Sequence, residues 1–339
     1  MQLILVPIEE IATERWDEFI LSPNTNGEFI NTHKYLSYHP EGRFVDKSVG
    51  IIDEQSGNIL CVFPAVLGNG NSVISHMGTS FAGPIFDLFK SSVVELLSYM
   101  DSIENHYQSL GFQSLDVRTS PVVFSKLHRE DILWAFWKRG YCLQGISLGN
   151  IVDLSAFNNE ENLFYIYESK RRNHVRKSLR DGGFSLCKAE MMPESLWNNL
   201  EKNLSRKFDT SPTHTFKEIQ DLMNRFPDRI EVLYSEDIYD GLYGAMAVIY
   251  KYKQVFHTQY LDMNYSLSSR YPNLYLIHHL LIRAKEAGFR WFSFGPSTER
   301  WGDVLNKGLF NYKNQFANGT ITYPRFVKSL DSHFEGGME

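Results

Sequence analysis

The stretch LYLIHHLLIRAKEAGFRWFSFG, residues 274–295, combines an amphipathic helix pattern, a glycine and a strongly apolar run. A second stretch, VVELLSYMDSIENHYQSLGFQSLDV at residues 93–117, has the same order. In both, apolar residues recur at helical spacing, and Gly111 or Gly288 stands where a helix C-cap belongs, directly before a strand pattern. This repetition, half a chain apart, predicts two related domains that each contain helices and strands.

Composition sets the broad class of the protein. The chain has 339 residues, which is long enough for two cores of ordinary domain size. A net charge of -6 argues against general affinity for nucleic acid, although it does not exclude a local basic site. Three cysteines without a CxxC pair indicate reduced thiols. No window reaches the ~20 apolar residues of a membrane span, so we expect a soluble, cytoplasmic protein and leave its oligomeric state open.

The order of elements predicts an α+β fold. Each half contains helices, then antiparallel strands, then a helix and a further strand. We place the boundary so that one domain covers residues 1–155 and the other residues 156–339. In the first half we expect strands at 47–53, 59–67, 72–77 and 141–154 and helices at 93–110 and 130–138. In the second half we expect helices at 160–180, 193–207, 215–225, 274–287 and 305–316 and strands at 229–235, 242–250, 254–261, 291–295 and 320–326.

Several segments make this order recognisable. The motifs are SHMGTSFAGP at 75–84, KRRNxxRK at 170–177, FGxS at 294–297 and LxxGLxxYKxxF at 305–316. The chain resembles the GNAT acyltransferase superfamily over nearly its whole length, and in particular the tandem FemAB-like and Fem-type peptidoglycan aminoacyltransferases. The resemblance implies two tandem GNAT-like domains, each a mixed, mostly antiparallel sheet flanked by helices. It also implies acyl transfer to an amine, with the acyl donor held by the second domain.

The resemblance leaves the acyl donor open. GNAT enzymes hold the donor beside a splayed strand pair, which here would be residues 242–250 and 254–261. They usually grip the pyrophosphate of CoA with a glycine-rich loop that opens the next helix. The corresponding loop, residues 262–272, contains no glycine, and Arg270 is its one cation. We therefore expect no bound cofactor, and either acyl-CoA as co-substrate or an aminoacyl-tRNA.

The segment HTQYLD, residues 257–262, supplies two catalytic candidates. Regular alternation along a strand would place His257 and Gln259 on one face and Thr258 and Tyr260 on the other. His257, with an ordinary pKa near 6.5, is the better general base. Tyr260 is a second acid or base, and Gln259 a substrate contact. The alternative is that His257 is only hydrogen-bonded beside the sheet.

The basic segment 170–180 is the strongest charge feature of the chain. It places Arg172, Arg176 and Arg180 on one helix face, and like charges at that spacing destabilise an isolated helix. An anionic ligand would explain the cluster, and a solvated face paired with acidic residues is the alternative. The resemblance implies that such residues help to hold a phosphorylated acceptor, with Lys34 as a second cation from the first domain.

Further candidates come from the closing motif and from two loops. Ser297 is the third catalytic candidate and Lys313 a substrate contact. His214 precedes a helix on a loop that we expect to be exposed and to face the second sheet, where it could touch substrate. Tyr35 could line an acceptor groove, although an aromatic residue at helical spacing is more often part of a core.

Three other sequence features do not indicate a catalytic or metal site. The pair His278 and His279 falls inside a helix, where packing is the ordinary role. The GISLG sequence at 145–149 resembles a nucleophile elbow, but no helix pattern follows it, which argues against a hydrolase. None of the 11 histidines has metal-ligand spacing, so we predict no metal.

These observations lead to one function and two alternatives. The chain would transfer an acyl group, with acetyl as first candidate, from an acyl-CoA thioester to an amine of a nucleotide-linked amino sugar or another cell-envelope precursor. One alternative is a Fem-type transferase that uses aminoacyl-tRNA and acts on a peptidoglycan precursor. The other is a GNAT-like module that binds a ligand without catalysis.

Overall fold

The computed structural model describes residues 2–331 and contains two compact units. The first comprises the residues up to Ser147, with Glu299–Val304 and the residues from Thr322 on; the second comprises Leu148–Thr298 and Leu305–Ile321. Strands β8 (Cys142–Asp153) and β16 (Gly319–Ser329) each begin in one unit and end in the other. The division differs from the predicted domains of 1–155 and 156–339, because the last strand returns to the first unit to pair with β7.

The first unit contains two sheets. One has the strand order β1-β2-β3-β6, and in the other β4, β5, β7 and β16 follow one another. The strands are β1 (Leu3–Pro7), β2 (Val49–Asp53), β3 (Ile59–Phe63), β4 (Val66–Leu67), β5 (Ser72–Ile74), β6 (Ile85–Phe86) and β7 (Ser114–Arg118). The helices are α1 (Thr13–Leu21), α2 (His33–Leu36), α3 (Val93–Ser109) and α4 (Asp131–Lys138).

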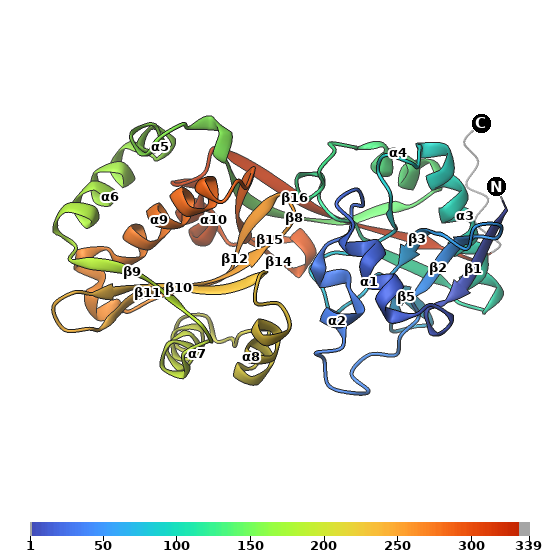
Figure 1. Cartoon of the computed structure of the whole chain (residues 1–339), viewed down its shortest axis with the longest axis horizontal. Helices are drawn as coiled ribbons and strands as arrows, with labels where there is room; N and C mark the ends of the chain where they lie inside the picture. Colours follow the sequence, from blue (N-terminus) through green and yellow to red (C-terminus); the bar gives the residue numbers. More distant parts are fainter. Residues whose placement is uncertain (1, 332–339) are drawn as a thin grey trace. The chain divides into compact units, whose positions relative to one another are not determined.

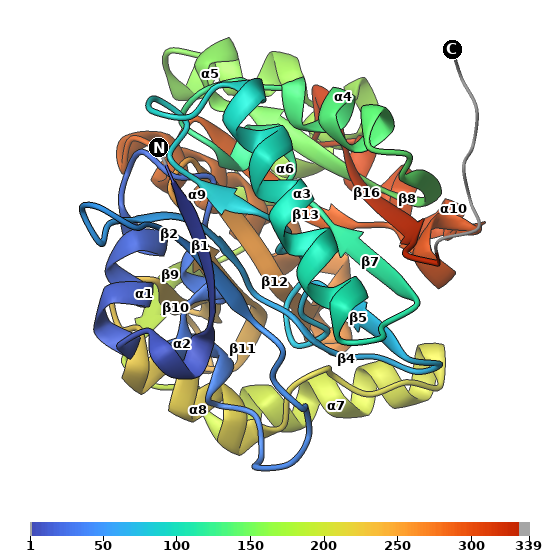
Figure 2. The same cartoon turned by 90° about the vertical axis from the view of Figure 1, so that its right-hand side faces the viewer.

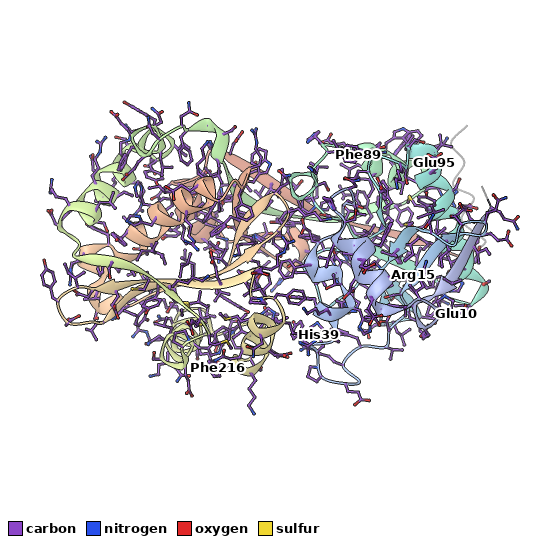
Figure 3. All side chains as sticks on the ribbon, in the orientation of Figure 1. Glu10, Arg15, His39, Phe89, Glu95 and Phe216 are labelled. Atoms are coloured by element: carbon purple, nitrogen blue, oxygen red, sulfur yellow. The ribbon has the colours of Figure 1, made fainter. Side chains whose placement is uncertain are left out.

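The sequence of helix α3 accounts for where the helix begins and which face it buries. Ser92 and Glu95 form a capping box at its first turn, where Glu95 is labelled in Figure 3. Its buried face includes Leu96 and Met100, which share a hydrophobic core with Val117 of β7. Figure 2 looks onto this unit, with α3 in front of β5 and β7. The opposite face of β7 is therefore free of the α3 core.

The second unit is one sheet with helices on both faces. Its strands follow the order β8-β13-β12-β11-β10-β9, with α9 and α6 on one face and α7 and α8 on the other (Figure 1). The strands are β9 (Phe184–Ala189), β10 (Ile230–Asp237), β11 (Tyr243–Lys251), β12 (Val255–Met263) and β13 (Trp291–Pro296). The helices are α5 (Glu160–Ile166), α6 (Ser169–Asp181), α7 (Glu194–Phe208), α8 (Phe216–Arg225), α9 (Pro272–Glu286) and α10 (Lys307–Asn314).

Short elements complete the chain. The two-residue strands β14 (Thr298–Glu299) and β15 (Val304–Leu305) pair with each other. The 3-10 helices are η1 (Ile8–Glu10), η2 (Phe29–Asn31), η3 (Val122–Phe124), η4 (Leu154–Ala156), η5 (Tyr265–Arg270) and η6 (Arg300–Gly302). Within residues 2–331, no helix combines the length and the apolar character needed to cross a bilayer.

The predicted repeat is present in both units. Gly111 after α3 and Gly288 after α9 both have φ of 82°. The next N–H, from Phe112 or Phe289, donates to a carbonyl five residues back, at 3.0 Å in each case. This is the Schellman arrangement, and it explains why glycine stands at both positions. In each unit, the strand that follows the helix runs parallel to an earlier strand: β7 to β5 in the first unit and β13 to β12 in the second.

Two predicted elements are divided in the structure. The predicted helix 160–180 is interrupted, because Tyr167 and Glu168 have extended backbone between α5 and α6. Tertiary contacts hold the break: the Glu168 N–H donates to the Gln315 carbonyl at 3.1 Å, and the Tyr167 hydroxyl lies 3.0 Å from His278 Nδ1. The predicted strand 59–67 divides into β3 and β4, which belong to different sheets.

The six-residue strand β9 (Phe184–Ala189) was not predicted. β9 follows the glycines that end α6 and pairs with β10 along its whole length, from Ala189 opposite Val232 to Phe184 opposite Asp237. Its short alternation of Phe184, Leu186 and polar residues was the available signal.

The helix caps allow a stability test. Replacing Gly288 by Ala should lower the free energy of unfolding by about 1–2 kcal/mol, because an L side chain is strained at φ of 82° although its Cβ would meet no atom within 4 Å. Urea unfolding measures the change.

The matched control is Gly308→Ala. Gly308 lies inside α10, and its added Cβ would have an ordinary 3.8 Å contact with the Asn306 side chain. This variant should be neutral or stabilised by up to about 1 kcal/mol. Equal losses in both variants would contradict the role assigned to the cap.

Candidate functional site

The central feature of the second unit is a fork between two parallel strands. β12 and β13 are paired only from Val255 opposite Trp291 to His257 opposite Ser293, and the ladder then ends. Beyond that point β12 stays with β11, whereas β13 stays with β8 as far as Pro296. The prediction that residues 242–250 and 254–261 would be splayed is wrong, because these strands form the paired hairpin β11–β12.

Two glycines hold β13 against β8. A Cβ on Gly149 would lie 2.8 Å from the Gly295 carbonyl oxygen, so the two backbones approach more closely than side chains would allow. Gly295 has φ of 71°, a conformation that favours glycine. Its own Cβ would come within 3.2 Å of the His257 ring. The absence of both side chains therefore shapes the fork and brings His257 to its base.

Lys313 reaches the same place from α10. Asn306 caps this helix, accepting a hydrogen bond from the Leu309 N–H at 3.0 Å. The Lys313 ammonium donates to the carbonyl oxygens of Gly295 at 3.1 Å and Pro296 at 2.7 Å. Burial lowers the pKa of Lys313 from 10.5 to about 7, and no carboxylate of the described residues forms an ion pair with this amine. The amine is therefore partly neutral near physiological pH, which is unusual for lysine and useful for proton transfer.

His257 is a neutral group at the base of the fork. It is 8% exposed, and its Nδ1 lies 3.1 Å from the Ser293 hydroxyl. Burial, and next the charge of Lys313, lower the pKa of His257 to about 3. A ring this weakly basic is a poor general base near pH 7. The structure thus favours a hydrogen-bonding role for His257, which was the alternative, over the predicted one as base.

A β-bulge changes which residues share a face. Tyr260 is opposite Val248 and Thr258 is opposite Ile249, so Gln259 is an extra residue in β12. Phe256 and Leu261 consequently both pack into the core beneath α9. His257 and Tyr260 therefore lie on the other face together, and the faces predicted from strict alternation are wrong.

Tyr260 and His214 form a hydrogen-bonded pair. The Tyr260 hydroxyl lies 2.7 Å from His214 Nδ1 and accepts the His214 backbone N–H at 3.2 Å. The Gln259 side chain also bonds the hydroxyl, and the Trp197 ring of α7 meets that of Tyr260 edge-on. Burial raises the pKa of Tyr260, so the hydroxyl keeps its proton near neutral pH. His214 is 5% exposed, so the expectation of an exposed loop residue is wrong.

Ser297 is buried with an unused hydroxyl. It is 2% exposed, and its Oγ has no hydrogen-bond partner within the part of the chain that the structure describes. Its backbone is fixed, because the N–H donates to the Leu148 carbonyl at 2.7 Å and the carbonyl accepts from Asn306 at 2.9 Å. A buried hydroxyl left in this way is available to a ligand.

The basic helix α6 has a large packing role. The guanidinium of Arg176 lies over the Phe164 ring at 4.9 Å, and that of Arg172 lies over Tyr165 at 5.5 Å. Arg172 also donates to the Tyr167 carbonyl at 3.3 Å. These contacts cover α5 and account for part of the charge on this helix. They do not place Arg172 or Arg176 beside the groups of the fork.

Two predicted site residues lie in the first unit. Tyr35 is 4% exposed, and its ring packs edge-on against Phe29 and Tyr38, so it belongs to a core. Lys34, beside it in α2, is exposed, and its backbone N–H donates to Asp17. Their role in binding an acceptor stays a prediction.

Arg270 is occupied. It forms an ion pair with Asp237, and its Nε donates to the Gly182 carbonyl at 2.8 Å. The helix α9 then begins at Pro272, after Tyr271 with φ of 59°. The one cation of this loop is therefore a structural tie between β10 and the end of α6, and this leaves it poorly placed to hold a pyrophosphate.

The histidine pair of α9 has the packing role that its position predicted. His278 is fully buried between Tyr167 and Glu160, with Nε2 2.9 Å from a Glu160 carboxylate oxygen. Among the described residues, no group of three or more His, Cys, Asp or Glu side chains could hold a metal ion. The prediction of no metal remains a prediction.

Comparisons with known proteins agree with this geometry. Residues 169–313 match the sequence model of the family described as "Acetyltransferase (GNAT) domain". The second unit has a GNAT fold. This segment contains β12, β13 and α10, so the GNAT match includes the whole fork. No curated protein sequence matches the chain.

Solved structures extend the GNAT similarity to both units. FemX is 13% identical, with a TM-score of 0.69 over 96% of this chain and 97% of its own. A tandem GNAT protein from the clavulanic acid biosynthesis pathway is 9% identical, with a TM-score of 0.55 over 97% and 99%. The C-terminal domain of a putative lysylphosphatidylglycerol synthetase from Agrobacterium fabrum is 13% identical, with a TM-score of 0.56 over 94% and 91%. The predicted tandem GNAT architecture is confirmed.

The environment of Lys313 predicts an unusual titration. Reductive ¹³C-methylation and NMR should show a lysine signal with a midpoint of about 7 that is absent from Lys313→Met. Because the unfolded chain binds this proton up to pH 10.5 and the folded chain loses it near 7, Lys313 makes the wild-type protein gain stability as pH rises through that window. In Lys313→Met, this gain should disappear from the pH dependence of urea unfolding. A midpoint above about 9.5 would contradict the burial argument.

Proposed function

We propose that this protein is an N-acyltransferase that moves an acyl group, with acetyl as first candidate, from an acyl-CoA thioester to an amine. The amine would belong to a nucleotide-linked amino sugar or to another cell-envelope precursor. The observation that carries the proposal is the fork of β12 and β13 in the segment that matches the GNAT acetyltransferase domain, with the partly neutral Lys313 at its edge. The structural similarity to FemX and the other proteins, at low sequence identity, supports the fold alone, and the identity of the acceptor is part of the proposal.

The chemistry needs a proton acceptor for the attacking amine. The amine nitrogen attacks the thioester carbonyl carbon, and the carbonyl oxygen becomes an oxyanion. As the C–N bond forms, the nitrogen loses a proton to Lys313, whose pKa of about 7 suits a general base near neutral pH. The Lys313 amine is held in place by two carbonyl oxygens, so its lone pair keeps a fixed position.

The leaving group needs a proton donor. When the oxyanion collapses, the C–S bond breaks and the thiolate takes a proton from the Tyr260 hydroxyl. The raised pKa of Tyr260 keeps that proton available, and His214 orients the hydroxyl at 2.7 Å. Solvent then returns a proton to Tyr260 and removes one from Lys313, so that the cycle is balanced. Ser297 contributes a free hydroxyl for a donor or oxyanion contact.

The Fem-type alternative is favoured by one observation. The loop before α9 lacks glycine, and Arg270 is committed to Asp237, so the loop offers no pyrophosphate grip of the usual GNAT kind. An aminoacyl-tRNA donor needs no such grip. The amine would then attack the ester carbonyl of the aminoacyl-tRNA, the aminoacyl group would be transferred as the C–O bond breaks, and the tRNA hydroxyl would leave, with the same roles for Lys313 and Tyr260.

A thermal-shift panel separates the two donors. The protein is heated with acetyl-CoA, CoA, bulk tRNA or uridine-diphosphate sugars, since a ligand at ~100 times its Kd stabilises by about 2.7 kcal/mol. A shift with acetyl-CoA and CoA supports the thioester reaction. A shift with tRNA and none with CoA supports the Fem-type reaction, and its steep salt dependence is a second check.

Turnover should depend on Lys313 and on pH. With acetyl-CoA and an amine acceptor, thiol release in Lys313→Met should fall by about 10²- to 10⁴-fold, the usual contribution of a general base. In the wild-type enzyme kcat/KM should rise with pH and level off above about 7, as Lys313 loses its proton.

Lys307→Met is the matched control. Lys307 is an exposed lysine on the same helix, so the change in charge and length is the same. Its activity and pH profile should equal those of the wild type. A Lys313→Met enzyme that keeps its rate would remove Lys313 from the mechanism, while leaving the donor assignment intact.

A further inference from the structure

The first unit contains a second fork with the same construction. Its parallel ladder runs from Ser72 opposite Ser114 to Ile74 opposite Asp116, three pairs long as in the second unit, and then ends. Counting from the capping glycines Gly111 and Gly288, the strand positions correspond one to one. Arg118 then takes the place of Gly295, and Ser120 takes the place of Ser297.

Backbone contacts fix the two sides of this first-unit fork. The Ser75 N–H donates to the Asp116 carbonyl at 2.8 Å, and the Arg118 N–H donates to the Ser75 hydroxyl at 2.8 Å. The chain then leaves β7 and returns only at Ala82, as an isolated bridge opposite Thr119. The residues between form a loop that His39, labelled in Figure 3, holds through the Gly78 carbonyl at 3.2 Å.

The face of β7 that points away from the α3 core carries charged side chains. Asp116 and Arg118 share this face by strand alternation. Arg325 of β16 lies directly opposite Arg118, and like charges in that position repel each other. The Asp116 carboxylate is committed to Arg325, through contacts of 2.9 and 3.0 Å to its Nε. Arg118 is therefore left without an ion-pair partner of its own among the described residues.

Trp301 covers both arginines. Its ring centroid lies 4.5 Å from the Arg118 guanidinium carbon and 5.3 Å from that of Arg325. The loop adopts positive φ at three successive residues, Arg300, Trp301 and Gly302, which costs conformational energy at the first two. Trp301 remains 47% exposed. A flat apolar surface thus borders the cationic group and stays accessible.

Three side chains of this fork, at or just beyond the ends of β5 and β7, carry a hydrogen-bond donor that no acceptor among the described residues takes up. Arg118 is 8% exposed, its guanidinium makes no hydrogen bond within residues 2–331, and its nitrogens keep some contact with solvent. The buried Ser120 hydroxyl has no partner in that range either. His76, 3% exposed, accepts the Gly78 N–H on Nδ1 at 3.1 Å, so its neutral ring carries the proton on Nε2. Burial, and next the charges of His39 and Arg118, lower the pKa of His76 to about 3.

We propose that the fork of the first unit binds an oxyanion, a carboxylate or phosphoryl group, which accepts hydrogen bonds from Arg118, Ser120 and His76. A guanidinium that is largely buried and lacks a protein hydrogen bond loses part of its hydration, and an oxyanion would restore hydrogen bonds to it. A cation is excluded by the charge, and a neutral apolar ligand would leave all three donors unpaired. This site stands apart from the proposed acyl transfer, because every residue that builds it belongs to the first unit.

The test is a titration of the full-length protein with inorganic pyrophosphate and with malonate. Calorimetry gives the Kd, and tryptophan fluorescence reports on Trp301 beside the site. We expect saturable binding of at least one probe at low ionic strength. Preference for pyrophosphate identifies a phosphoryl group as the natural ligand, and preference for malonate identifies a carboxylate. Binding of neither probe overturns the proposal.

The variants locate the site. Arg118→Gln should weaken binding by at least about tenfold, and Ser120→Ala by severalfold. Asp116→Asn should tighten it, because the nearest negative charge is removed. Lys126→Gln, an equal charge change at an exposed position of the same unit, should have no effect.

Two further outcomes keep the proposal falsifiable. If Arg118→Gln does not fold, as judged by circular dichroism, Ser120→Ala and Asp116→Asn decide in its place, because they should change affinity in opposite directions. If Lys313→Met abolishes binding while Arg118→Gln leaves it intact, the anion binds in the second unit and the proposal is wrong. That result would leave the acyltransferase proposal unaffected.

Discussion

The close approach of two backbones, at Gly149 and Gly295, is the constraint on which the second unit depends. With no side chain on either residue, β13 follows β8 and parts from β12 after Ser293. The same conformation turns the carbonyls of Gly295 and Pro296 towards the Lys313 amine. A larger residue at Gly149 would meet the Gly295 carbonyl, and a larger residue at Gly295 would meet His257. The opening between the strands and the chemistry at its edge therefore have one cause.

Burial gives the groups at this fork different properties. Lys313 donates to two carbonyl oxygens and has no carboxylate partner within residues 2–331, so desolvation shifts it towards the neutral amine. His257 sits deeper and next to that amine, so its ring stays neutral and acts through hydrogen bonds. Tyr260 keeps its proton for the same physical reason. Burial thus leaves Lys313 able to accept a proton and Tyr260 able to donate one. This combination suits a reaction in which one group loses a proton and another gains one.

Local patterns were enough to predict the repeated helix, glycine and strand, because the cap at Gly111 or Gly288 depends on its own neighbours. The capping box of Thr215 and Glu218 was predictable for the same reason, and both of its hydrogen bonds are present. The fork was placed on the wrong strands, since its position depends on Gly149, which lies far away in the sequence. The bulge at Gln259 and the break at Tyr167 are likewise set by tertiary contacts, and neither leaves a local signal.

For the site residues too, the identity of some could be predicted from local sequence, whereas their environment depends on tertiary contacts. Lys313 was named from a motif, but its lowered pKa depends on burial that no spacing reveals. Arg172 and Arg176 were named from their charge, whereas their guanidinium groups lie on aromatic rings of α5. Ser293 and Arg118 were missed, although both belong to the repeated strand from which the fold was predicted. Aligning the two copies residue by residue, rather than by pattern, was the signal that could have found them.

The aligned copies show how one backbone can support two kinds of site. At the base of the second fork, the polar group is His257 on the first strand, and Gly295 on the other strand makes room for it. In the first unit the corresponding residues are Ile74 and Arg118, so the polar group has moved to the opposite strand. Each fork thus has one polar side chain at its base. Each also has a buried serine hydroxyl on the second strand, at Ser120 two residues after Arg118 or at Ser297 two residues after Gly295. The cation of the first fork is a fixed charge, whereas the lysine of the second can lose its proton. That difference separates a place suited to holding an anion from one suited to catalysing acyl transfer.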